Sequence, residues 1–188
     1  MGYRYYDNIS GVGHPATVSV VIDNSDDVQI GDAVKCLNGN LEKLAATSSQ
    51  SVFGVIVDIV DKNGNSVFGS IAELGTASLS STNPLSGTVT VASNNETVDL
   101  IAAKVVVDKN ARFSVDVTGT VNTTVSSTKP GAYLNCDDEN SVDETTATRT
   151  AGTARQFYSW GADPNDTTRL IVSINASEVY NNVDVLAA

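Results

Sequence analysis

Short runs of apolar residues, many of them β-branched, alternate with turn signals along most of the chain. The run at 52–60 leads into Asn63-Gly64, and a second Val-Phe-Gly follows at 67–69, so this stretch predicts a β-hairpin. Valine, isoleucine and threonine pack well on a pleated sheet and lose rotamer freedom in a helix. The pattern therefore predicts a chain that is mainly β.

Other strands follow from the same alternation and from their flanking turns. Alternation at 113–117 places Phe113, Val115 and Val117 on one face and turns Ser114 and Asp116 toward water. The segment at 98–108 could form a helix, but three consecutive valines favour a strand, and 137–154 is expected to be an acidic polar loop. Further strands are predicted at 17–23, 31–37, 41–46, 66–74, 87–93, 118–128, 131–136, 155–160 and 169–180. So many short strands predict an all-β fold, an antiparallel β-barrel or β-sandwich with an extended N-terminal arm.

A Ser/Thr/Asn/Pro segment at 78–87 marks the best candidate boundary in the chain, because it combines a shift in composition with Asn83-Pro84 and Gly87. This divides the chain into an N-terminal arm at 1–16, a first β region at 17–82 and a second at 83–188. The two β regions could also form one continuous domain.

The N-terminal arm carries three of the six tyrosines beside an arginine and shows no periodicity. It is either a frayed terminus or a segment that docks on a capsid or a neighbouring subunit, and its aromatic residues favour docking. We expect the arm to have no way to bury these side chains locally, and the body from Thr17 onward to fold without it. The candidate interface residues in the arm are Tyr3, Arg4, Tyr5 and Tyr6.

Trp160 is the only tryptophan, and Phe157 and Trp160 are expected to fill the core or a subunit contact. Trp160 is therefore the fifth candidate interface residue. Sugar-binding sites usually need aromatic platforms, which a single tryptophan supplies poorly. Paired carboxylates for glycoside hydrolysis remain open, because their approach is spatial.

The formal charge of −11 comes from 22 acidic and 11 basic residues, and both halves of the chain are acidic. Without a basic stripe to neutralise phosphates, direct nucleic-acid binding is disfavoured. No apolar run is long enough to span a membrane, and the start of the chain lacks the apolar core of a signal peptide, so we expect synthesis in the cytosol.

Candidate chemistry is sparse. His14 is the only histidine, so serine-protease-like triads and multi-histidine metal sites lack members. Asp61–Asn65 has alternate oxygen-bearing side chains like a calcium loop, but a hairpin turn explains every one of them. The five carboxylates at 137–144 are interpreted as a solvated loop, and Cys36 and Cys136 as two free, half-buried thiols rather than a disulfide. We expect no cofactor, no metal and no enzymatic activity.

The segment 31–76, with its Gly-Asp-Ala-Val strand, tight turn, Val-Phe-Gly-Val-Ile-Val strand and glycine-led return, resembles the head-decoration (cement) proteins of tailed bacteriophages. The segments 111–121, 130–136 and 155–174 are similar to the C-terminal strands of the same group. Together they cover most of residues 17–176. The resemblance implies a small β protein, generally a trimer or dimer, that sits on the outside of a virion and bridges major capsid protein subunits.

The leading hypothesis is thus a homo-oligomeric virion structural protein, made in the host cytoplasm, that stabilises a capsid by binding the major capsid protein. Three-fold symmetry is the guess that the resemblance implies. The alternative is a carbohydrate-binding or adhesin-like β module displayed on a virion surface, for which Trp160 would be the test residue.

Overall fold

The structure, a computed structural model, is built from strands alone, which confirms the all-β fold class. The described residues form fifteen strands and no helix, so none of them belongs to a helix able to cross a membrane. The residues described are 2–11, 13–22, 28–37, 39–45, 51–61, 63–66, 76–79, 88–91, 96–99, 102–118, 130–150 and 155–175.

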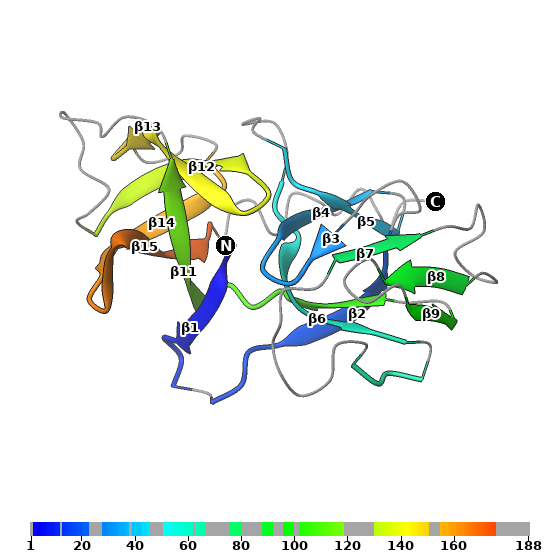
Figure 1. The fold of residues 1–188 in the computed structure, drawn as a ribbon. Coiled ribbons are helices and arrows are strands. Elements are labelled where there is room, and N and C mark those ends of the chain that lie inside the picture. The colour runs from blue at the N-terminus through cyan, green and yellow to red at the C-terminus, as the bar shows by residue number, and fades with distance from the viewer. Residues whose placement is uncertain are drawn as a thin grey trace.

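Five C-terminal strands close into a barrel, coloured from green to orange in Figure 1. They are β11 (Ala111–Thr118), β12 (Ala132–Asp138), β13 (Ser141–Thr148), β14 (Phe157–Asp163) and β15 (Asp166–Ile174). Their order is β11-β13-β12-β14-β15, and antiparallel pairing of β15 with β11 completes the ring. The β11–β13 pair is parallel, whereas the others are antiparallel. The first strand of the chain, β1 (Arg4–Asn8), adds to β11 as an antiparallel edge strand.

The remaining strands form two further sheets beside the barrel (Figure 1). The five-stranded sheet has the order β2 (Thr17–Val21), β10 (Ala102–Val106), β6 (Gly54–Val60), β4 (Ala33–Leu37) and β5 (Asn40–Lys43). The four-stranded sheet has the order β3 (Val28–Gln29), β7 (Thr76–Leu79), β8 (Thr88–Val91) and β9 (Glu96–Asp99).

Strand pairing does not follow the predicted boundary near residue 83. Strands β8, β9 and β10 come after that point in the chain but pair, directly or through one another, with strands that come before it. One buried cluster joins Leu44, Val55 and Val106 of the five-stranded region to Phe113 and Val115 of the barrel. The barrel and the five-stranded sheet therefore share a core.

The predicted turn at 61–65 is present. Asp61 Oδ1 accepts hydrogen bonds from the backbone N–H groups of Asn63 (2.8 Å) and Asn65 (2.9 Å), and Gly64 has a φ of 84°. Val60 on β6 forms an antiparallel bridge with Ser66. The Asp61 carboxylate oxygens, which in the sequence suggested a calcium loop, therefore accept hydrogen bonds within the turn. The predicted return strand at 67–74 and the predicted strand at 119–128 lie outside the described residues.

Two sequence-based expectations are corrected within the strands. The stretch at 98–108 is β structure, as predicted, but it contributes to two strands, β9 and β10, rather than one. The expected polar loop at 137–154 is wrong, because β13 occupies its centre and turns Val142, Glu144 and Ala147 inward. Of the four buried residues in this eight-residue strand, only Val142 and Ala147 are apolar, so the apolar pattern of the sequence does not reveal the strand.

Candidate functional site

The start of the chain is packed into the barrel, contrary to the expectation of a free arm. The Tyr3 side chain is 3% exposed, and its ring stacks on Phe157 with centroids 5.0 Å apart and meets Phe113 edge-on. Its backbone N–H donates to the Gly31 carbonyl over 2.8 Å. Burial raises the pKa of the Tyr3 phenol well above its ordinary value, so it stays neutral. Tyr3 therefore belongs to the core and not to a free interface.

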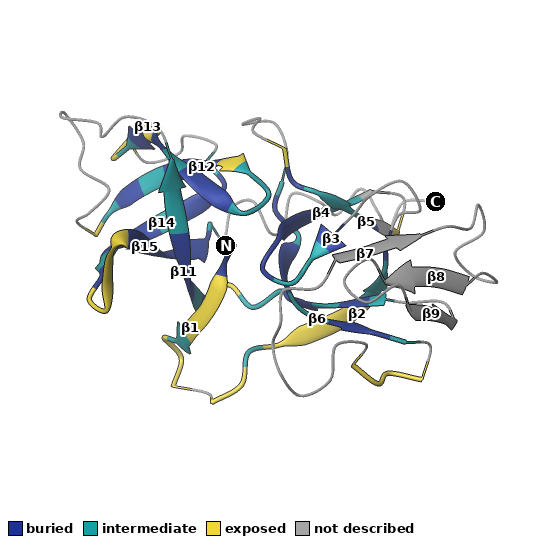
Figure 2. Ribbon diagram, in the orientation of Figure 1, coloured by how far each residue is buried: buried dark blue, intermediate teal, exposed yellow. Residues whose placement is uncertain are grey.

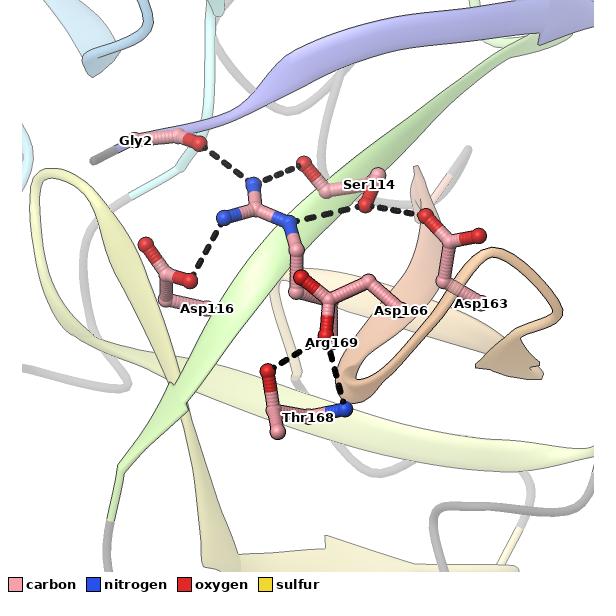
Figure 3. A network of polar contacts seen from close by, with 7 residues as sticks. All are labelled: Gly2, Ser114, Asp116, Asp163, Asp166, Thr168 and Arg169. Atoms are coloured by element: carbon pink, nitrogen blue, oxygen red, sulfur yellow. Dashed lines mark hydrogen bonds and ion pairs between the residues drawn. The ribbon is translucent and has the colours of Figure 1, made fainter.

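A buried arginine fixes the residue before Tyr3 (Figure 3). Arg169 on β15 is 3% exposed, and its guanidinium donates to the carbonyl oxygens of Gly2 (2.8 Å) and Ser114 (2.7 Å) and to the Asp116 carboxylate (2.5 Å). Ser114 Oγ in turn donates to Asp163 over 2.6 Å. Ser114 is thus buried, which corrects the expectation that it faces water. A side chain at position 2 would collide with the Gly31 carbonyl, so glycine suits this close approach.

The anchored start places β1 along the outside of the barrel. Tyr5 and Tyr6 are 38% and 37% exposed, and Arg4 is exposed beside them. The register with β11 shifts between Tyr5 and Asp7, which leaves Tyr6 as an extra residue in a bulge. Both oxygens of Asp7 then accept hydrogen bonds from Arg112, and this pairing raises the pKa of the guanidinium.

Beyond β1, one row of side chains crosses the outside of the barrel. Tyr133 on β12 lies opposite Tyr158 on β14, Tyr158 opposite Ser173 on β15, Ser173 opposite Arg112 on β11, and Arg112 opposite Asp7 on β1. Directly opposite residues in a ladder point to the same face of a sheet. Five strands thus supply one continuous outer row, which is aromatic at one end and charged at the other.

Trp160 packs on this row and is held at three points. Its indole Nε1 donates to Ser173 Oγ over 3.0 Å, and the Tyr158 ring meets it at a 70° angle with centroids 5.1 Å apart. The Arg112 guanidinium lies 5.5 Å from the indole centroid. Phe157 is fully buried and fills the core, one of the two roles expected of it, whereas Trp160 is half-buried, so of its two expected roles the subunit contact stays a prediction. Residues three apart in a strand point to opposite faces.

A groove with a volume of about 360 Å³ runs beside Trp160. The rings of Tyr133 and Tyr158 line it together with Ile9, Lys109 and Asn110. Tyr133 and Tyr158 are in edge contact, with centroids 5.3 Å apart. The sequence-based reasoning missed both tyrosines and Arg112. The signal that could have identified Tyr158 is the alternation along β14: inward Phe157 and Ser159 require Tyr158 and Trp160 to point outward.

The structure brings two of the five candidate interface residues together. Tyr6 and Trp160 both lie against Arg112, at 5.8 and 5.5 Å from ring centroid to guanidinium carbon. Tyr5 lies on the other side of β1, edge-on to Phe113. Arg4 is exposed opposite Ser114, and Tyr3 is in the core.

The exposed large apolar side chains come from one short part of the sequence, residues 5–18. The large hydrophobic residues that are exposed in the described part of the chain are Tyr5, Tyr6, Ile9 and Val18, which we call the N-terminal strip. They lie on β1, on β2 and on the connection between these strands, which Figure 2 shows as mostly exposed. Val18 is 40% and Ile9 46% exposed.

One carboxyl group is unusual for its burial. Asp32 is 2% exposed and accepts a hydrogen bond from the Gln29 backbone N–H over 2.8 Å. Burial raises the pKa of Asp32 to about 7; Glu139 and Asp138 also raise it, whereas the Gln29 N–H and Lys43 oppose the shift. Lys43 forms an ion pair with Glu139 at 3.0 Å, which links the five-stranded sheet to the barrel.

The other candidate groups are not among the residues that line the groove. His14 is exposed in the connection between β1 and β2. Both cysteines are free, as predicted, but Cys136 is fully buried and only Cys36 is half-buried. The five carboxylates at 137–144 belong to the β12–β13 hairpin, and Glu144 among them is buried. Within the described ranges, no three metal-ligating side chains lie together as a cluster.

The chain matches none of the protein-family models, curated proteins or solved structures with which it was compared.

Proposed function

We propose that the chain is a virion structural protein, a decoration (cement) protein that binds the outer surface of a tailed-phage shell and stabilises it. Its partner is the major capsid protein, and its place is the outside of the virion after synthesis in the host cytoplasm. The sequence resemblance supports this proposal, and the observation that carries it is the N-terminal strip.

The N-terminal strip has the composition of a protein-binding surface. Burying a large apolar side chain completely stabilises by roughly 1.5–3 kcal/mol, and each of these four residues, 37–46% exposed, would gain part of that free energy when a partner covers it. Arg4 lies beside the strip, and arginine and tyrosine are the residue types that contribute most at interfaces.

The barrel holds β1, which carries Tyr5 and Tyr6 of the strip, in place before any partner arrives. Arg169 and Tyr3 fix the chain at the start of β1, and pairing with β11 fixes the strand itself. A preorganised surface loses little conformational entropy on binding. Repetition over a symmetric shell then multiplies modest individual contacts into strong attachment.

Co-sedimentation tests the proposal. Purified protein is mixed with empty, undecorated shells of the phage that encodes it, and the bound fraction is measured after centrifugation. We expect saturable binding that falls at least about tenfold in affinity, or about 1.4 kcal/mol, in the double variant Tyr5→Ser/Val18→Ser. Thr167→Ser, an exposed position on β15, is the matched control and should bind as the parent does. Failure of the parent protein to sediment with shells would contradict the proposal.

A further inference from the structure

We infer that the groove beside Trp160 is a binding site for a saccharide, with a sugar ring packed against the aromatic wall formed by Tyr133, Tyr158 and Trp160. This site goes beyond attachment to a shell, because it takes a small ligand on the barrel face; of the N-terminal strip, only Ile9 lines it.

The aromatic wall is rigid before a ligand binds. Trp160 is oriented by its hydrogen bond to Ser173, by the Tyr158 ring and by the Arg112 guanidinium. Arg112 is itself fixed by its paired hydrogen bonds to Asp7. A ring held in this way loses almost no freedom when a ligand packs against it. The C–H bonds of a pyranose face carry slight positive charge and suit the negative face of an aromatic ring.

Polar groups suited to sugar hydroxyls stand on the same groove. The hydroxyls of Tyr133 and Tyr158 and the side-chain amide of Asn110 make no hydrogen bond to another protein group in the described part of the chain. They can donate to and accept from a ligand. A few polar groups on a mainly apolar wall are typical of small-molecule sites, and about 360 Å³ is within the size range of such sites.

The charge of the lining also favours a saccharide over a basic peptide. The chain has 22 acidic residues, yet no carboxylate is among the residues that line the groove, and Lys109 is its one charged member. Neutral sugars and sugars that carry a carboxylate both suit such a lining. The experiment below uses both neutral and acidic oligosaccharides in order to distinguish these two classes of sugar.

Trp160 provides a direct readout, because it is the only tryptophan in the chain. We would titrate the full chain with soluble oligosaccharides, neutral (chitotriose, maltotriose) and acidic (3′-sialyllactose, a galacturonate trimer), and record tryptophan emission and its quenching by acrylamide. We expect at least one probe to shift the emission and to protect Trp160 from quenching in a saturable manner.

Three variants locate the site. Tyr158→Phe removes a hydroxyl but keeps the ring, and Asn110→Ala removes the amide; each should weaken binding of the active probe by about tenfold. Tyr5→Ala, on the far side of β1 from the groove, is the aromatic control and should leave binding unchanged. Thermal unfolding checks that each variant is folded. If Tyr158→Phe does not fold, Asn110→Ala alone tests the site.

The proposal is overturned if no probe changes the emission at about 10 mM, a concentration that would occupy most of a site with a Kd of about 1 mM. It is equally overturned if Asn110→Ala and Tyr158→Phe bind the probe as the parent does, or if these variants lose only binding to shells, since the groove would then be a protein contact. Shell co-sedimentation of Asn110→Ala separates failure of this site from failure of the proposed decoration function.

Discussion

The guanidinium of Arg169 donates a hydrogen bond to the carbonyl oxygen of Gly2 over 2.8 Å, which joins two residues 167 positions apart in the chain. The same arginine bridges β11 through Ser114 and Asp116. Both ends of the described chain therefore meet in one buried contact, and the strand that carries Tyr5 and Tyr6 depends on it.

Replacing Arg169 with methionine should destabilise the protein by about 2–4 kcal/mol, because two buried carbonyl oxygens and part of a carboxylate lose their donor. The measurement is urea unfolding followed by circular dichroism. Arg149→Met, at an exposed arginine, is the control and should cost less than about 1 kcal/mol. Equal losses in the two variants would contradict the assigned role of Arg169.

Tyr3→Ala should destabilise the protein by about 3–5 kcal/mol, since it leaves a cavity between Phe113 and Phe157. Deleting residues 2–8 should also lower the thermal midpoint, in contrast to the sequence-based expectation that the body folds without its first 16 residues. Tyr5→Ala, with its ring 38% exposed, is expected to cost less than about 1 kcal/mol. Differential scanning calorimetry distinguishes the three, and an unchanged midpoint for Tyr3→Ala would show that Tyr3 is dispensable.

Stability should fall as pH rises from about 4 to about 7 because of Asp32. Burial raises its folded pKa to about 7 from an ordinary value of 3.8, so between these values the folded chain keeps a proton that the unfolded chain has released. The stability that protonated Asp32 contributes is fully present below pH 4 and lost above pH 7. Between these values the free energy of unfolding falls by at most about 1.4 kcal/mol per pH unit.

Asp32→Asn keeps an acceptor for the Gln29 N–H but cannot ionise. The difference in unfolding free energy between this variant and the parent should grow in favour of the variant from pH 4 to pH 7. Urea unfolding at several pH values measures it, and the subtraction cancels the other carboxylates. A difference that is independent of pH would show that Asp32 titrates normally.

The two thiols should differ in reactivity. Burial raises the pKa of Cys136 to about 12, and its Sγ donates to the Ala45 carbonyl over 3.1 Å. The reagent therefore cannot reach this buried thiol, and almost none of it is in the reactive thiolate form. Half-buried Cys36 should react with Ellman's reagent in the native protein, slowly because burial also raises its pKa. We expect one thiol per chain before unfolding and two after it. Cys36→Ser should abolish the native reaction, and a residual signal from Cys136 would contradict its burial.

Sheet edges that are left open by the fold favour association of the chain with itself. The expected assembly is a closed homo-oligomer, with three-fold symmetry as the first choice. Light scattering coupled to gel filtration should return about three times the chain mass of 19.6 kDa at micromolar concentration. A mass of one chain would exclude the oligomer under these conditions.

The strands and turns were predictable because their signals are local. The Asn63-Gly64 turn, the strand character of 41–43 and the inward face of Phe113 and Val115 all follow from neighbouring residues. Partners were not predictable, because alternation says which face a residue takes and nothing about which strand lies beside it. The pairing of β1 with β11, which buries Tyr3, joins segments about 100 residues apart.

The candidate site shows the same division. Trp160 was identified from composition, and its outward orientation could have been deduced from the parity of Phe157. Its neighbours Tyr133, Ser173 and Arg112 come from three other strands, so only the folded barrel reveals the row. The sequence pattern places Ser114 in water because it cannot show that Arg169, which is distant in the chain, binds Ser114 and the Gly2 carbonyl and so helps to bury Ser114.

Tyr6 interrupts the hydrogen-bonding ladder of an edge strand, between Tyr5 and Asp7. An uninterrupted edge accepts another strand, and repeated addition of identical strands builds fibrils. The bulge and the charges of Arg4 and Asp7 oppose such growth at β1. The chain can therefore reach a high concentration without polymerising through this strand.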